Sequence, residues 1–241
     1  MRIKKSVFWF GFAFFVSGFL FCSCSQSCLL AEKNQSEKLN SVKILNWNLQ
    51  TFFDGNFSGT EYSEFASSSA GWCKEKYGVR LERLSEVVKA CEPDIFVMQE
   101  LENEDQLYDI FNRLCSNFSV SKNYSYGCFY KDEGSAIGLG VLSRFTLFGK
   151  TVHSLDVRSE AESQPSMRPL LKVFVNVNER HLLLLVNHWK SKSGGAEKSE
   201  VWRNFQESVL AQSFAEYEGK NIPVVACGDF NRDILEFRKI N

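Results

Sequence analysis

The sequence has few prolines and histidines and no strong excess of charge of either sign. Its 241 residues include 4 prolines, 15 glycines and 3 histidines, and 28 basic side chains nearly balance 29 acidic ones. So few prolines and glycines leave no room for a long linker and exclude a collagen-like repeat. The net charge of -1 neither requires nor excludes a polyanionic partner, because a neutral protein can carry a local basic cleft.

The residues that are present are typical of a globular protein. Hydrophobic residues make up 44% and charged residues 24%, values that argue against a disordered chain and against a coiled coil. A chain of 241 residues is long enough to bury a sizeable core. Its length predicts one large domain or two small ones.

The N-terminal segment has the pattern of an export signal. Three basic residues, Arg2, Lys4 and Lys5, precede an almost wholly apolar run over residues 7–21. This run is short for a membrane-spanning helix, which needs about 20 residues, and it fits the apolar region of a secretory signal. Cys24 follows a small residue, serine, and this pair resembles a bacterial lipoprotein signal.

Cys24 is therefore the first candidate for lipid attachment, ahead of Cys28. We expect a lipoprotein-type signal peptide over residues 1–23, a polar tether over 24–41 and a folded domain over 42–241. The protein would then be exported and lipid-anchored to a bacterial membrane. The alternatives are an uncut N-terminal anchor and an ordinary cleaved signal, which would give a periplasmic or secreted protein.

Five cysteines follow the signal, and no two of them have the CxxC spacing of a zinc site. An odd number in an exported protein leaves at least one cysteine unpaired. At most two disulfides are expected among the five, and their connectivity stays open. The sequence therefore argues against a structural zinc.

Apolar patterning predicts an alternation of strands and helices. Short apolar runs predict buried strands, and apolar residues at helical spacing predict helices. The expected strands cover residues 42–48, 95–98, 135–142, 170–177, 181–186 and 222–227, and the expected helices cover residues 79–91, 103–115 and 197–218. This order predicts an α/β protein in which two packed sheets are covered by helices within one domain.

Polar residues with useful chemistry stand at the ends of four predicted strands. They are Asn48, Glu100, His188 and Asp229, with Asn231 two residues further on. Ligand sites in α/β folds gather at strand ends, because the loops converge there. Some of these residues also have a purely structural interpretation: Glu100 as a helix cap, His188 as a buried structural histidine and Asn231 as a turn residue. The repetition over four strands favours a site.

These groups suit the hydrolysis of a phosphodiester. The reaction needs a base for the attacking water, positive potential at the phosphoryl oxygens and help for the leaving oxygen. A carboxylate, an imidazole and an amide beside a metal ion supply all three.

The motifs around these residues carry a resemblance to a known family. They are Trp47-Asn48, Gln99-Glu100, Asn187-His188, Gly228-Asp229-Phe230-Asn231 and Arg168-Pro169-Leu170. Together they resemble the endonuclease/exonuclease/phosphatase superfamily, the metal-dependent group that includes deoxyribonuclease-I-like nucleases. The resemblance runs from about residue 42 to residue 233. It implies a four-layer α/β sandwich of two packed β-sheets flanked by helices.

The resemblance also implies a site for a divalent cation. Glu100 is similar to the metal-binding carboxylate of the family, and Asn48 is similar to the amide beside the metal. A hard cation that is held by few protein oxygens suits Mg²⁺, with Mn²⁺ as its usual substitute.

The same resemblance implies catalytic and phosphate-binding groups. Asp229 is similar to the carboxylate that orients or deprotonates the attacking water, and Asn231 to a donor toward the phosphoryl oxygens. His188 is similar to the imidazole that stabilises the phosphate or assists the leaving group. Arg168 and Lys190 are expected to bind the substrate phosphate, although Lys190 also fits a solvated basic loop.

The function expected from these residues is that of an exported, metal-dependent nuclease. The basic loop after His188 resembles exported bacterial nucleases and favours nucleic acid as the substrate, with DNA favoured over RNA. The alternatives are a lipid- or inositol-phosphate phosphodiesterase or phosphatase, and a catalytically inactive lipoprotein that binds through the same fold. We expect a monomer that is held at the membrane by its lipid.

One motif of the superfamily is absent from the sequence. The family pattern closes with Ser-Asp-His, and the twelve residues after Asp229 contain no histidine. The sequence therefore predicts a fold that is incomplete at the C-terminus and a chain whose hydrolytic activity is severely impaired.

Overall fold

The computed structural model describes residues 41–66, 70–115, 122–155 and 164–238. They all lie within one structural unit, Leu39–Asn241. The predicted signal peptide, Cys24 and almost all of the predicted tether lie outside the described residues. Within the described ranges, no helix is both long and apolar enough to cross a membrane.

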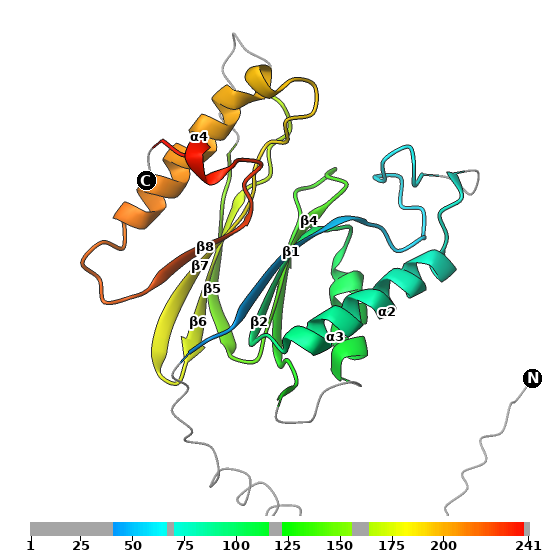
Figure 1. Ribbon diagram of the computed structural model, residues 1–241, viewed down its shortest axis with the longest axis horizontal. Helices are drawn as coiled ribbons and strands as arrows, with labels where there is room; N and C mark the ends of the chain where they lie inside the picture. Colours follow the sequence, from blue (N-terminus) through cyan, green and yellow to red (C-terminus); the bar gives the residue numbers. More distant parts are fainter. Residues whose placement is uncertain (1–40, 67–69, 116–121, 156–163, 239–241) are drawn as a thin grey trace, which may run out of the picture. The chain divides into compact units, whose positions relative to one another are not determined.

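The described residues form two four-stranded mixed sheets (Figure 1). In the first sheet, β1 (Ile44–Phe52) is parallel to β2 (Ile95–Leu101), and both β2 and β3 (Tyr126–Tyr130) pair antiparallel with β4 (Gly138–Ser143). In the second sheet, β5 (Thr146–His153), β6 (Leu170–Val177) and β7 (Arg180–His188) are successive antiparallel neighbours, and β8 (Val224–Asp229) is parallel to β7. In each sheet, the two strands that end in predicted site residues are parallel neighbours, so their carboxyl ends meet at one edge.

Helices cover the outer face of each sheet. Helices α2 (Lys74–Cys91) and α3 (Glu104–Cys115) lie on the first sheet, and α4 (Ala196–Ala215) lies on the second (Figure 1). The order of layers is helix, sheet, sheet, helix. The four-layer α/β sandwich predicted from the sequence is confirmed.

The hydrophobic core follows from the alternation of side chains along each strand. On β2, Phe96 and Met98 pack beneath α2 and α3, whereas Ile95 and Val97 face the second sheet. All four side chains are fully buried. A strand that is covered on both faces has a continuous apolar run in its sequence, and for this reason β2 could be predicted.

The elements depart from the expected ones where apolar patterning is weak. The sequence predicted no bounds for β3 or β5, although the segment around His153 is strand-like, and β5 is a largely exposed edge strand that is interrupted at Gly149, where φ is 59°. Helix α2 begins at Lys74, ahead of the expected start at residue 79, and α4 ends at Ala215, before the expected end at residue 218. The five cysteines of the described residues are all free.

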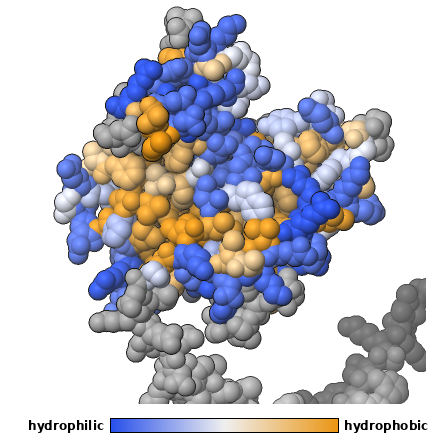
Figure 2. Space-filling model, viewed as in Figure 1, coloured by the Kyte–Doolittle hydropathy of each residue, from blue (hydrophilic) through white to orange (hydrophobic). Residues whose placement is uncertain are grey.

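An apolar hollow of about 770 Å³ separates α4 from β8. Figure 2 shows hydrophobic residues gathered over β8 on this face. The lining is mainly aliphatic and aromatic, with Glu218 as its one charged residue. The hollow therefore offers little to a phosphate, and the predicted site residues do not line it.

Candidate active site

Asn48 lies between two carboxylates that come from different sheets. Its Nδ2 donates a hydrogen bond to Oε1 of Glu100 at 2.9 Å and another to Oδ2 of Asp229 at 2.8 Å. Glu100 belongs to β2 and Asp229 ends β8, so residues that are 129 positions apart in the sequence share one amide nitrogen. The two sheets thus bring their carboxylates to a single point.

Backbone bends at the strand ends aim these side chains. The hydrogen-bond register of β1 against β2 shifts between Asn48 and Phe52, and that of β2 against β4 shifts on either side of Glu100. Glu100 itself has φ of 68°, a conformation that is uncommon for any residue other than glycine. Such bulges are a common way of re-aiming a side chain beside an active site. The strained backbone of Glu100 therefore lies where the predicted site residues meet.

The Glu100 carboxylate is held on both oxygens. Oε2 accepts a hydrogen bond from the backbone N–H of Thr51 at 2.6 Å, while Oε1 accepts the one from Asn48. The side chain of Glu100 is 16% exposed, so it is screened from water without being sealed off. Its orientation is therefore set by β1, not by its own strand.

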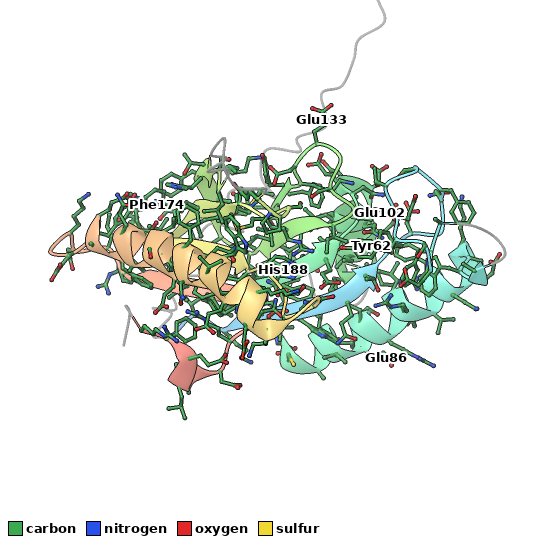
Figure 3. The ribbon with its side chains drawn as sticks, turned by 90° about the horizontal axis from the view of Figure 1, so that it is seen from above. Tyr62, Glu86, Glu102, Glu133, Phe174 and His188 are labelled. Carbon is green, nitrogen blue, oxygen red and sulfur yellow. The ribbon has the colours of Figure 1, made fainter. Side chains whose placement is uncertain are left out.

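His188 is buried at the end of β7, with an exposed fraction of 3%. Figure 3 shows it between the side of the domain that carries α4 and the side that carries α2 and α3. Its Nε2 lies 3.6 Å from Oε1 of Glu100. Burial first and then the positive charge of Arg168 lower the pKa of His188, against the opposing charge of Asp229, to about 3. At neutral pH the imidazole is therefore uncharged, and its Nδ1 has no hydrogen-bond partner among the described residues.

The turn after β8 is fixed by hydrogen bonds and by one close backbone approach. Oδ1 of Asp229 accepts the backbone N–H of Asn231 at 2.9 Å, and Nδ2 of Asn231 donates to the carbonyl of Trp189 at 3.1 Å. Gly228 has φ of 139°, and a Cβ at this position would fall 2.0 Å from the carbonyl oxygen of Asn187. Only glycine fits there, which explains the first residue of the Gly-Asp-Phe-Asn motif.

The structure places the predicted residues unequally. It brings together Asn48, Glu100, His188 and Asp229, with Asn231 in the adjoining turn, and a cleft of about 560 Å³ opens beside Asn48, Asp229 and Asn231. Arg168 is close enough to affect the charge state of His188.

Lys190 is anchored through its backbone, because its N–H donates to Gln206 and its carbonyl accepts from Arg203. Lys192, on the same loop, lines the cleft and is paired with Glu236.

Two residues that support the site were not predicted. Nδ2 of Asn46 donates to the carbonyl of Gly228 at 3.1 Å, and its Oδ1 accepts from Nε2 of the buried Gln99 at 2.9 Å. Because side chains two apart on a strand share a face, the Asn-Trp-Asn run of β1 was a signal for Asn46. Arg80 of α2, which contacts the backbone after Asn48, carried no such signal.

The donor set fits a hard divalent cation that keeps part of its water shell. Among the described residues no three histidine, cysteine, aspartate or glutamate side chains gather closely enough to enclose a metal. Mg²⁺ does not need such a cage, because one or two carboxylates and the substrate phosphate commonly suffice. Glu100 supplies one such carboxylate, and Asp229 lies beside it, since both accept hydrogen bonds from Asn48. The Asn48 amide presents its nitrogen to them, while its Oδ1 accepts the backbone N–H of Gln50 at 2.9 Å.

A sequence model of the endonuclease/exonuclease/phosphatase family matches residues 43–237. The chain therefore belongs to this family, whose members generally depend on a divalent metal. No curated protein matches the chain.

Several solved structures share the fold. TDP2 of C. elegans is 17% identical, with a TM-score of 0.59 over 90% of this chain and 56% of that one. D. rerio TDP2 complexed with single strand DNA product is 19% identical, with a TM-score of 0.53 over 80% and 62%. A mannosyl-6-phosphatase of Bacteroides thetaiotaomicron is 18% identical, with a TM-score of 0.54 over 81% and 67%. The chain spans 50–66% of the length of the C. elegans structures that it matches.

Proposed function

We propose that the chain is an exported, Mg²⁺-dependent phosphodiester hydrolase that acts on nucleic acid. The observation that carries this proposal is the convergence of Glu100 and Asp229 on Asn48. Two carboxylates that share one amide nitrogen, one of them lining a cleft, together with the buried imidazole next to Glu100 supply a cation site, a base and a hydrogen-bond donor. The identified family includes both nucleases and phosphatases, so the cleaved ester and the metal are parts of the proposal.

Each residue has a task that follows from its contacts. Glu100 would hold the cation, which when bound supplies positive charge against the phosphoryl oxygens. Asp229 is fixed by hydrogen bonds to both of its oxygens, so it is oriented to accept a proton from the attacking water. His188 is neutral at working pH and donates a hydrogen bond to the phosphate or to the leaving oxygen, while Arg168 adds positive charge beside it.

Nucleic acid is the favoured substrate because a basic loop borders the cleft. Its exposed basic residue in the lining is Lys192, and a cationic side chain draws a phosphate backbone, whereas the Arg232 guanidinium is buried against Glu207. The structural likeness to D. rerio TDP2, which was solved with a single strand DNA product, agrees with this choice. The likeness to a mannosyl-6-phosphatase makes a phosphomonoester the contrasting substrate for any assay.

The direct test is cleavage of labelled single-stranded DNA and of supercoiled plasmid by excess purified protein, with Mg²⁺ or with EDTA. We expect slow cleavage that EDTA abolishes and that His188→Ala lowers by about 10²–10⁴-fold, as expected for loss of one electrostatic or proton-transfer group. His181→Ala is the matched control, since His181 lies at the exposed start of the same strand, against Phe148.

Absence of any Mg²⁺-dependent cleavage, or full activity of His188→Ala, would contradict the proposal. Release of phosphate from a sugar phosphate or a phospholipid headgroup, with none of the DNA cleaved, would move the chain to the phosphatase or lipid-directed class.

A further inference from the structure

Arg80 of α2 holds three consecutive carbonyls of the first sheet. Its Nη2 donates to the carbonyls of Leu49 at 2.6 Å and Gln50 at 2.7 Å, and its Nη1 donates to that of Thr51 at 2.9 Å. A guanidinium presents its donors in a planar fork, so it can serve three acceptors at fixed angles. The three carbonyls belong to the bulge that interrupts the register of β1 against β2.

This bulge is conformationally costly without a partner. Gln50 has φ of 54° and Thr51 has φ of 52°, and neither residue is a glycine. Residues in this region are strained, and they persist only when their surroundings impose the conformation. Arg80 provides that constraint, because release of the bulge would leave its guanidinium part-buried without acceptors.

The bulge in turn holds two residues of the proposed site. The N–H of Thr51 donates to Oε2 of Glu100, and the N–H of Gln50 donates to Oδ1 of Asn48. Arg80 is itself braced by aromatic rings, with its Cζ 5.1 Å from the Phe52 ring centroid. A chain of contacts therefore runs from α2 through the bulge to both side chains.

We propose that Arg80 is a positioning residue for the divalent-cation site. It fixes the backbone of Leu49–Thr51, and this backbone orients the Glu100 carboxylate and the Asn48 amide. The inference rests on the proposed function, since it assumes that a cation binds there. Arg80 does not touch the cation or the substrate.

If only the charge of Arg80 mattered, its removal would strengthen cation binding, whereas loss of its positioning role would weaken binding. The charge of Glu100 acts on Arg80, so a positive group stands close to the carboxylate that would receive the cation. If Arg80 mattered only through its charge, Arg80→Met would tighten cation binding and Arg80→Lys would leave it unchanged. If Arg80 positions the bulge, both variants weaken binding, because neither side chain has the planar fork.

The experiment measures Mn²⁺ binding by electron paramagnetic resonance and Mg²⁺ binding by calorimetry in the full chain. We expect Arg80→Lys and Arg80→Met to weaken binding by about 10–100-fold, the usual effect of losing an outer support of a metal ligand. Arg83→Lys and Arg83→Met are the controls, because Arg83 is an exposed arginine of the same helix. They should bind as tightly as the parent chain.

Two further measurements separate positioning from loss of fold. Thermal unfolding without metal establishes that Arg80→Lys, which keeps the charge and most of the packed stem, is folded. Adding Gln50→Gly to Arg80→Lys should restore part of the affinity, because glycine adopts φ near 54° without strain. Unchanged binding by folded Arg80→Lys, or tighter binding by Arg80→Met, overturns the inference. A parent chain that binds neither cation overturns the proposed function instead.

Discussion

Among single residues, Glu102 carries the clearest consequence for pH. It is 1% exposed, its Oε2 accepts the N–H of Asp54 at 2.8 Å, and its carboxyl shares a hydrogen bond with Glu61. Burial, together with the charges of Asp54 and Glu61, raises the pKa of Glu102 from 4.5 to about 7, although the hydrogen bond from the Asp54 N–H lowers it. The folded protein therefore keeps a proton on this carboxyl that the unfolded chain releases.

The sign of the resulting pH dependence follows from linkage. Between pH 4.5 and about 7 the folded state binds more protons at Glu102, so the stability contributed there is complete below pH 4.5 and is lost as the pH rises through 7. We predict that Glu102→Gln, which mimics the protonated acid, removes this loss. Urea unfolding at pH 5 and pH 8 measures it. Equal pH dependence in parent and variant would show that Glu102 ionises freely in the folded state.

The proximity of candidate site residues was predictable where a reactive side chain ends a buried strand. Asn48, Glu100, His188 and Asp229 were identified in this way, and the structure brings them together. Arg80 was not, because its partners are backbone carbonyls, which no sequence pattern marks. The orientation of the Asn48 amide was also beyond prediction, since it depends on two carboxylates from separate sheets.

At the scale of the elements, the position of β8 and of the turn after it depends on Gly228. Gly228 combines positive φ with a close backbone contact to Asn187, whereas Gly219, at the turn after α4, has φ of 74° and open space around its Cβ position. We predict that Gly219→Ala lowers the free energy of unfolding by about 1 kcal/mol, because alanine is strained at this positive φ but its Cβ contacts nothing. Gly228→Ala should cost more, since β8 must also move away from β7.

Chemical unfolding of the two alanine variants, together with Mn²⁺ binding, checks this prediction. Gly228→Ala should lose affinity for the cation because Asp229 moves with the strand, and Gly219→Ala should keep it. Similar unfolding free energies and similar affinities for the two variants would mean that the approach to Asn187 is not needed to hold Asp229.

The sequence predicted elements well where both faces of a strand are buried. The apolar run of β2 and the paired strands β6 and β7 were expected close to their observed bounds. The bounds of β5 were not predicted, because an exposed edge strand has no core to impose an alternating pattern. The side-chain contact of β1 with β8 across the two sheets, which assembles the candidate site, is a long-range property that local patterning does not encode.

At the scale of the whole molecule, export and lipid attachment remain predictions from the sequence. Cys24 is expected to carry the lipid, because it follows a small residue at the end of an apolar run. Cys24→Ala should therefore abolish incorporation of radioactive palmitate and release the protein from the membrane fraction, whereas Cys28→Ala should not. Undiminished label in Cys24→Ala, with loss in Cys28→Ala, would move the attachment site.

The central claim is that Glu100 and Asp229, carried by two different sheets, form one hydrolytic site. Single-turnover, Mg²⁺-dependent cleavage of labelled single-stranded DNA by Glu100→Gln, Asp229→Asn and the double variant tests it most directly. We predict that each single variant loses about 10²-fold or more, and that the double variant is little worse, because groups that act as a unit are not additive. Cleavage at the parent rate by either single variant, or losses that multiply in the double variant, would contradict the claim.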